Sequence, residues 1–251
     1  MELKRAPFQG VINIIRFNWH FYVIAVLLLL FALGLQIIAP FYLQRILFWS
    51  TLLGTITIII SLLVSYYIYD YSSLYQLSWL PNLNDKKVLN INAGFDETSE
   101  IIRGDFTNIE LTKCDFYDSK KHTEVSIERA RLLYPPSRDT IKVNTHKLPF
   151  KDNTFSVVIV MFSAHEIRNT EERELFFKEL VRVMKEDGQI FVTEHLRDSF
   201  NFMAYTIGFF HFYSKSSWLQ TFKNAGLSLI KEKKNTPFVS TFILQENGDT
   251  N

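Results

Sequence analysis

Cysteine is nearly absent from this sequence, which has one, Cys114, among its 251 residues. A disulfide bond within the chain is therefore excluded, and this composition fits a reducing compartment. The sequence also lacks an excess of charge, since its formal net charge at pH 7 is +1. This balance gives no indication of nucleic-acid binding. His195 and His211 have no spacing typical of a metal site, and no cluster of cysteine and histidine exists, so we expect no bound metal.

Charged residues are missing from two long apolar stretches, residues 21–39 and 46–68. Each is close to the ~20 residues that a helix needs to cross a hydrocarbon core about 30 Å thick. Aromatic residues cluster near their ends, as in the interfacial belts of membrane proteins. A signal peptide would be shorter, and a helical hairpin buried in a soluble protein rarely carries such uninterrupted apolar runs. The sequence therefore predicts a membrane anchor over residues 1–80, with transmembrane helices at about 20–39 and 46–68.

The basic residues around these two stretches indicate an orientation. Lys4, Arg5 and Arg16 precede the first stretch, whereas the connection between the two holds only Arg45. Because positive charge is enriched in cytoplasmic segments, both termini are expected in the cytoplasm. We therefore expect a membrane protein with two spans, whose remaining residues, 81–251, form a cytoplasmic domain.

Short strands and helices alternate from Lys87 onward, a pattern that predicts an α/β sheet with helices on both faces. We expect strands at residues 86–92, 108–116, 140–144, 154–162, 189–195, 227–234 and 237–247. We expect helices at residues 96–104, 123–135, 171–188 and 216–226. Gly188 is expected to stop the third of these helices, and Ser216 or Ser217 is expected to cap the fourth, with Gly226 just past its end.

Glycine is scarce in the turn VLNINAGFDETSEII, residues 88–102. The stretch has the layout of a nucleotide-cofactor loop, with a strand, a tight turn at Gly94 and the start of a helix. Asn92 and Asp96 stand where such loops usually have glycine. Asp115 lies 21 positions after Gly94, and an acid about 20 positions beyond the turn can accept hydrogen bonds from ribose hydroxyls. Since ligands bind beyond the carboxyl ends of parallel strands, these residues indicate a cofactor site.

Two longer segments resemble the class I S-adenosylmethionine-dependent methyltransferases, which have a Rossmann-like sheet of seven strands. These segments are HKLPFKDNTFSVVIV, residues 146–160, and ELVRVMKEDGQIFVTEH, residues 179–195. The resemblance runs from about Lys87 to about Gln245 and implies a methyltransferase-like domain over residues 81–251. It implies S-adenosyl-L-methionine as the cofactor. This cofactor has no phosphate, so the loop needs fewer glycines than a dinucleotide site does.

The resemblance also implies which residues bind the cofactor. Asp115 falls on the acid that binds ribose, Asn144 on the residue that meets the adenine amino group, and Thr145 on the backbone contact that follows. Asn90, where the family often has Asp, and Ser156, which replaces an Asp, depart from the pattern. The expected cofactor-binding residues are Asn92, Ala93, Gly94, Asp115, Phe116, Asn144, Thr145 and Phe162.

His165 follows the fourth strand, where the methyl group of the cofactor should point, and it is our candidate general base. Glu166 is the second catalytic candidate, and Glu194 is a further choice. The alternatives are that His165 only packs against the cofactor or caps a helix, and that the two glutamates hold Arg168 and Arg197.

The Phe-rich stretch at residues 200–212 follows the fifth strand. It could be a core helix under the edge of the sheet, or a lid that covers the acceptor and contacts the bilayer. We expect a lipophilic small-molecule or carrier-bound acceptor, such as an isoprenoid quinone precursor, an aryl or polyene lipid or an acyl chain. The alternatives are an inactive methyltransferase-like membrane module that docks a biosynthetic partner, whose cofactor cleft would be occluded, and a site for another nucleoside.

Overall fold

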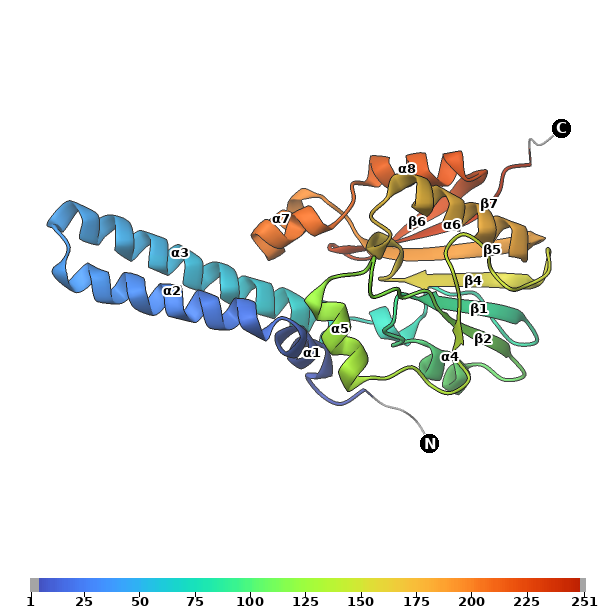
Figure 1. The fold of residues 1–251 in the computed structure, drawn as a ribbon, viewed down its shortest axis with the longest axis horizontal. Helices are drawn as coiled ribbons and strands as arrows, with labels where there is room; N and C mark the ends of the chain where they lie inside the picture. Colours follow the sequence, from blue (N-terminus) through green and yellow to red (C-terminus); the bar gives the residue numbers. More distant parts are fainter. Residues whose placement is uncertain (1–4, 249–251) are drawn as a thin grey trace.

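The computed structural model describes residues 5–248. It has two parts, a long helical hairpin and an α/β domain (Figure 1). The hairpin consists of α2 (Trp19–Ile38) and α3 (Phe41–Tyr66), which lie side by side. A short helix, α1 (Gln9–Phe17), precedes them at the base of the hairpin. Pro40 separates α2 from α3 because an extended proline without a backbone N–H ends one helix and precedes the next.

Both hairpin helices are long and apolar enough to cross a membrane, with mean hydropathies of 2.7 and 2.2 over their most apolar windows. Core helices of soluble proteins and signal sequences can reach the same length and hydropathy. Core helices, however, bury their apolar side chains, and no residue within α2 is buried. The hairpin therefore presents its leucine, isoleucine and phenylalanine side chains outward.

Seven strands form one mixed sheet among the described residues, and each coincides with a strand expected from the sequence. The sheet order is β3-β2-β1-β4-β5-β7-β6, with β7 antiparallel to its two neighbours and the first five strands parallel. The strand bounds are β1 Lys87–Asn92, β2 Glu110–Asp115, β3 Ile141–Lys142, β4 Phe155–Met161, β5 Met184–His195, β6 Leu227–Thr236 and β7 Val239–Glu246. The expected α/β sheet of seven strands is thus confirmed.

Helices connect the strands, as the alternating pattern predicted. Their bounds are α4 Ser99–Asp105, α5 Val125–Leu133, α6 Thr170–Val183, α7 Ser199–Tyr205 and α8 Lys215–Asn224. Shorter turns of helix are η1 Tyr67–Tyr71, η2 Leu74–Gln76, η3 Ala164–Glu166 and η4 Thr206–His211. The Ser214 side chain caps α8 by accepting a hydrogen bond from the Ser217 N–H, so the expected cap at Ser216 or Ser217 was wrong. Gly226 lies just past the end of α8 with φ +81°, as expected.

The expected helix stop at Gly188 was also wrong. Helix α6 ends at Val183, and β5 begins at Met184. Gly188 lies inside β5, where a Cβ atom would stand 2.5 Å from Met184 Cγ and 2.8 Å from the Lys185 carbonyl oxygen. Glycine is therefore required at this position by close packing rather than by a helix end.

The core of the α/β domain has one layer on each face of the sheet. Helices α6 and α8 cover one face with aromatic side chains, among them Phe176, Phe177 and Trp218. The other face is covered by α4 and by the segment that follows the hairpin, which buries Ile68 and Leu83. This segment holds the hairpin against the sheet, because its apolar side chains pack in the core of the α/β domain.

Candidate functional site

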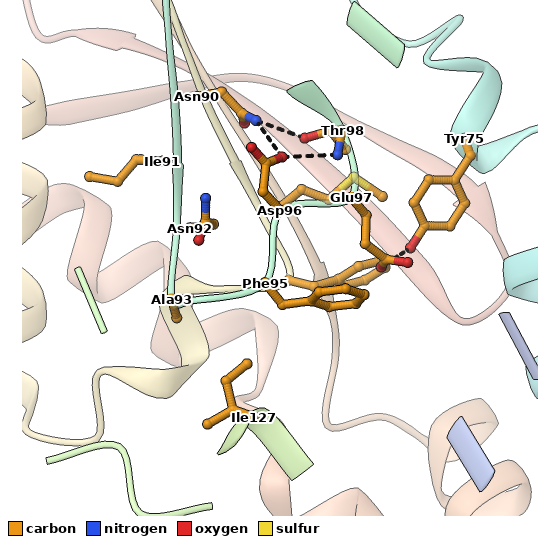
Figure 2. Close-up of a pocket in the computed structure, with 12 residues that line it drawn as sticks. Tyr75, Asn90, Ile91, Asn92, Ala93, Phe95, Asp96, Glu97, Thr98 and Ile127 are labelled. Carbon is orange, nitrogen blue, oxygen red and sulfur yellow. Dashed lines mark hydrogen bonds between the residues drawn. The ribbon is translucent and has the colours of Figure 1, made fainter. Parts of the chain in front are cut away.

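The candidate site lies at the carboxyl ends of β1, β2 and β4. The chain runs outward from β1 to β2 and β3, and returns through β4 on the opposite side of β1. Such a reversal of strand order opens a crevice in which α/β proteins bind ligands. A cavity of about 50 Å³ occupies this place, and Figure 2 shows the residues around it. Its lining includes Asn92, Ala93 and Phe162, three of the expected cofactor-binding residues.

The loop after β1 is shaped by the side chains that replace glycine. Gly94 has φ +104°, a conformation that L-residues rarely adopt. The Asn92 side chain accepts a hydrogen bond from the Gly94 N–H at 2.8 Å. The Asp96 carboxylate accepts hydrogen bonds from the Thr98 N–H and from the Asn90 amide (Figure 2). It also accepts from the Ser99 N–H at the start of α4. Asn92 and Asp96 therefore stabilise the turn and the helix start.

The amide nitrogen of Asn92 is a hydrogen-bond donor without an acceptor among the described residues. Asn92 is 5% exposed, and this nitrogen is buried. A buried donor without an acceptor costs about 1–3 kcal/mol. Because Asn92 lines the cavity, an acceptor oxygen of a bound molecule could satisfy this amide.

A second cavity, of about 210 Å³, lies at the ends of β2 and β3. Phe116, Asn144 and Thr145, three further expected cofactor residues, are in its lining. The Thr145 hydroxyl donates to Glu172 at 2.5 Å, and Lys121 contacts the same carboxylate at 2.8 Å. The structure thus places the residues expected to hold the adenine end beside one another.

Arg131 of α5 lies beside Gly94 and Asp115 and was missed by sequence reasoning. Its Nη1 atom is 2.5 Å from an oxygen of Asp115, the expected ribose-binding acid. A Cβ atom on Gly94 would be 2.5 Å from the same nitrogen. The space next to Gly94 is therefore filled by Arg131, with Tyr117 beneath the guanidinium at 4.4 Å. No local signal marks Arg131, since its partners come from other segments.

Phe95 lines the smaller cavity and also contacts residues at the base of the hairpin (Figure 2). Its ring contacts Phe17 of α1 at 5.4 Å and Tyr134 at 5.2 Å between centroids. Arg5 and Tyr75 both contact the carboxylate of the neighbouring Glu97, at 3.1 and 2.5 Å. The segments that flank the hairpin therefore pack against one side of the loop that follows β1.

A second polar group lies past the end of β4, where η3 carries His165 and Glu166. His165 Nδ1 is 2.7 Å from Glu194, and His165 Nε2 is 3.3 Å from Glu166. Burial alone would lower the pKa of His165, but the carboxylates of Glu194 and Glu166 raise it to about 10. In this arrangement His165 keeps its proton at neutral pH, and a general base must first lose it.

The two arginines that could have paired with these glutamates lie elsewhere. Arg168 contacts Glu124 and His211, and Arg197 donates to the carbonyl groups of Phe210 and Phe212. The alternative that Glu166 and Glu194 hold these arginines was therefore wrong. Sequence reasoning also missed His211, whose ring lies 4.9 Å from that of His165 between centroids.

The Phe-rich stretch forms α7 and η4, and α7 lies beside α3 of the hairpin (Figure 1). Within α7 the buried residues are Asn201 and Ala204. Large apolar side chains along the stretch face outward, and these are Phe200, Phe202, Met203, Ile207 and Phe210. The alternative of a core helix was therefore wrong.

Residues 89–192 match the family described as "Methyltransferase domain". A ubiquinone/menaquinone biosynthesis C-methyltransferase, UbiE, of Haemophilus ducreyi is 31% identical over 72 residues, which cover 29% of this chain. The chain spans 27% of the length of that curated relative.

Solved structures of methyltransferases are similar in fold to part of this chain. A chain in the complex between the Haloferax volcanii Trm112 methyltransferase activator and a protein described as a methyltransferase has 13% identity and a TM-score of 0.50. The likeness covers 70% of this chain and 89% of that one. A SAM-dependent methyltransferase from Aquifex aeolicus has 15% identity and a TM-score of 0.49, over 67% of this chain and 86% of that one. Residues from β1 to β5 thus match a methyltransferase domain, and the seven-strand sheet has the fold of the Haloferax volcanii structure.

Proposed function

We propose that this protein transfers a methyl group from S-adenosylmethionine to a lipophilic or carrier-bound acceptor at a membrane surface. The observation that supports a lipophilic acceptor is the outward-facing apolar stretch of α7 and η4. This stretch adjoins the hairpin at one end and supplies His211 to the polar group around His165 at the other. An acceptor that is held in a bilayer would reach His165 along these side chains.

The cofactor brings a reactive methyl group, so the protein mainly has to position donor and acceptor. We assign Asn92, Ala93 and Gly94 to its amino-acid end, where the unpartnered Asn92 amide offers a donor. Asp115 would accept hydrogen bonds from the ribose hydroxyls. The remaining assignments are Phe116, Asn144 and Thr145 around the adenine, and Phe162 at the end of β4.

The donor and acceptor groups fit this cofactor, but the space does not until Arg131 moves. The two cavities, about 50 and 210 Å³, are each smaller than the ~300 Å³ of a small ligand pocket. Arg131 fills the space beside Gly94 and pairs with Asp115. Its long side chain can rotate away without moving the backbone, and this movement would free both Gly94 and Asp115.

The hairpin is assigned as a membrane anchor because it is strongly apolar and no residue within α2 is buried. The basic residues before α2 favour a cytoplasmic α/β domain. The curated relative is named for ubiquinone and menaquinone biosynthesis, and we extend an isoprenoid type of acceptor to this chain as one candidate. An aryl or polyene lipid and a carrier-bound acyl chain are the others.

Cofactor binding can be tested by calorimetry on the full chain in detergent, with Asp115→Ala as the variant. Heat of binding that is lost in Asp115→Ala supports the assignment, and the absence of heat at millimolar S-adenosylmethionine contradicts it. The acceptor can be sought by comparing lipid extracts of cells with and without the protein for a mass difference of one CH₂. The catalytic roles of His165 and Glu166 are tested by turnover of His165→Ala and Glu166→Gln.

A second candidate function is an inactive module that docks a biosynthetic partner. The ion pair between Arg131 and Asp115 favours it, because it closes the cleft beside Gly94. In that case S-adenosylmethionine would fail to bind even after Arg131→Ala, whereas an enzyme with a movable arginine would bind it.

A further inference from the structure

Two histidines and a glutamate converge at the acceptor side of the site. His165 and Glu166 come from η3, and His211 comes from the end of η4. One ligand atom from each of the three lies within 4.8 Å of the other two. The Glu166 carboxylate is 3.3 Å from His165 Nε2 and 4.0 Å from His211 Nε2. Ligands at about 2.1 Å from a tetrahedral metal lie roughly 3.4 Å apart, so small side-chain shifts would complete this geometry.

Each imidazole is oriented by a second carboxylate on its other nitrogen. Glu194 lies 2.7 Å from His165 Nδ1, and Glu124 lies 2.7 Å from His211 Nδ1. His165 Nε2 is thereby directed toward Glu166. His211 Nε2 lies 4.0 Å from Glu166 and 3.0 Å from Arg168 Nη2, so the Arg168 side chain has to move aside before this nitrogen binds a metal ion. A carboxylate on the far nitrogen of a histidine is the usual support of a metal ligand, because it fixes the tautomer and makes the ligand more basic.

The charges around the three ligands suit a divalent cation. Glu124, Glu166 and Glu194 are three carboxylates, and Arg168, which contacts Glu124 and the ring of His211, is the nearby guanidinium. A metal ion would displace the proton that His165 otherwise keeps, and with both imidazoles then neutral these groups leave two negative charges. Glu194 is 1% exposed and the His211 side chain is 26% exposed, so the group is enclosed on one side and accessible on the other.

We propose that His165, Glu166 and His211 bind a divalent transition-metal ion, with zinc as the best fit, and that Glu194 and Glu124 orient the two histidines. Two histidines and one glutamate are a ligand set of catalytic zinc sites, which keep a position open for water or a substrate oxygen. In this site His165 holds the ion instead of removing a proton from the acceptor. The spacing along the chain gave no sign of it, because folding brings η3 and η4 together from distant segments.

The test uses the full chain in detergent after treatment with a chelator, with Co²⁺ as the spectroscopic probe and Zn²⁺ as the competitor. We expect one equivalent of Co²⁺ to give visible absorption bands, and Zn²⁺ to abolish them. His211→Ala should weaken the affinity for Co²⁺ at least tenfold, and Glu194→Gln should weaken it about 10- to 100-fold, as losses of a supporting carboxylate do. The His211 side chain is partly exposed, and we therefore expect His211→Ala to fold.

His146→Ala is the matched control, because His146 is an exposed histidine beside Glu172, outside this group. Its Co²⁺ affinity should equal that of the unmodified chain. The proposal is overturned if the unmodified chain gives no Co²⁺ bands, or if His211→Ala binds Co²⁺ as tightly as His146→Ala. Metal binding is read without S-adenosylmethionine, so its outcome is separate from that of the proposed methyl transfer.

Discussion

Arg131 Nη1 lies 2.5 Å from the Asp115 carboxylate and fills the space beside Gly94. An ion pair that must break before a ligand binds reduces the apparent affinity by the free energy of that pair. We therefore expect the ion pair between Arg131 and Asp115 to lower the affinity of the protein for S-adenosylmethionine.

Replacing Arg131 should open the cleft. We expect Arg131→Ala to bind S-adenosylmethionine about tenfold more tightly, which corresponds to about 1.4 kcal/mol, in calorimetric titrations. The same variant should be less stable without cofactor, because Asp115 is left buried without its partner. Arg138→Ala, which removes an exposed arginine near α5, is the control and should change neither quantity. Equal affinity in the two variants would show that Arg131 does not compete with the cofactor.

Gly94 is constrained twice, by its backbone and by Arg131. Gly94→Ala places a side chain at φ +104°, which should lower the free energy of unfolding by about 1–2 kcal/mol. The new Cβ atom would also clash with Arg131 at 2.5 Å. The double variant with Arg131→Ala should remove the clash and keep the backbone cost. Chemical denaturation of the four proteins separates the two effects, and strict additivity would contradict the steric part.

The buried His195 should make stability depend on pH. Burial lowers the pKa of His195 to about 4, whereas an unfolded histidine has a pKa of about 6.5. The folded state thus favours the neutral ring, and its stabilising effect is full above the unfolded pKa. It is lost as the pH falls from about 6.5 toward 4, by an amount on the order of 3 kcal/mol.

Denaturation midpoints across this pH range should therefore fall less in His195→Gln than in the unmodified chain. His146→Gln, at an exposed position, should keep the original dependence. The Tyr69 hydroxyl lies 2.8 Å from His195 Nε2, and a glutamine amide can replace that contact. A dependence on pH that is the same in all three proteins would assign it to other groups.

The apolar stretch of α7 and η4 should matter for acceptors in a bilayer. Ile207 is 82% exposed, so Ile207→Asp should leave the fold intact while placing a charge on this face. We expect methyl transfer to acceptors in lipid vesicles to fall at least tenfold, with no change for a short-chain soluble analogue. Leu132→Asp, at a position 78% exposed on α5, is the control. Equal losses in both variants, or none in Ile207→Asp, would contradict a lid that contacts the bilayer.

The strands could be predicted from the sequence because their signal is local. The apolar run of β4, for instance, is explained by its position in the middle of the sheet, where both faces are covered. The end of α6 was harder to place, because Gly188 resembles a helix stop in sequence and its actual role depends on contacts with Met184 and Lys185. The cap of α8 was also hard to place, because Ser214, Ser216 and Ser217 are all serines and any of them can cap a helix.

The candidate site was only partly visible in the sequence. Asn92 and Asp115 end β1 and β2, and Asn144 lies two residues past the end of β3, so the topology of a parallel sheet brings the three to one edge. Arg131 and His211 come from helices after β2 and β5, and their meeting with Asp115 and His165 depends on tertiary packing. No periodicity or spacing records such contacts, and therefore neither the pairing of Arg131 with Asp115 nor that of His165 with His211 could be predicted.

Phe17 of α1 packs against Phe95, and Arg5 pairs with Glu97, in the loop that follows β1. A shortened protein that starts after the hairpin would keep every strand of the sheet and lose these two contacts. Such a protein would be a poor stand-in for the intact one, since its cofactor loop would be missing a neighbour. For the same reason, a movement of the hairpin relative to the sheet would displace the loop that follows β1. The contact between Phe17 and Phe95 and the ion pair between Arg5 and Glu97 would transmit this movement.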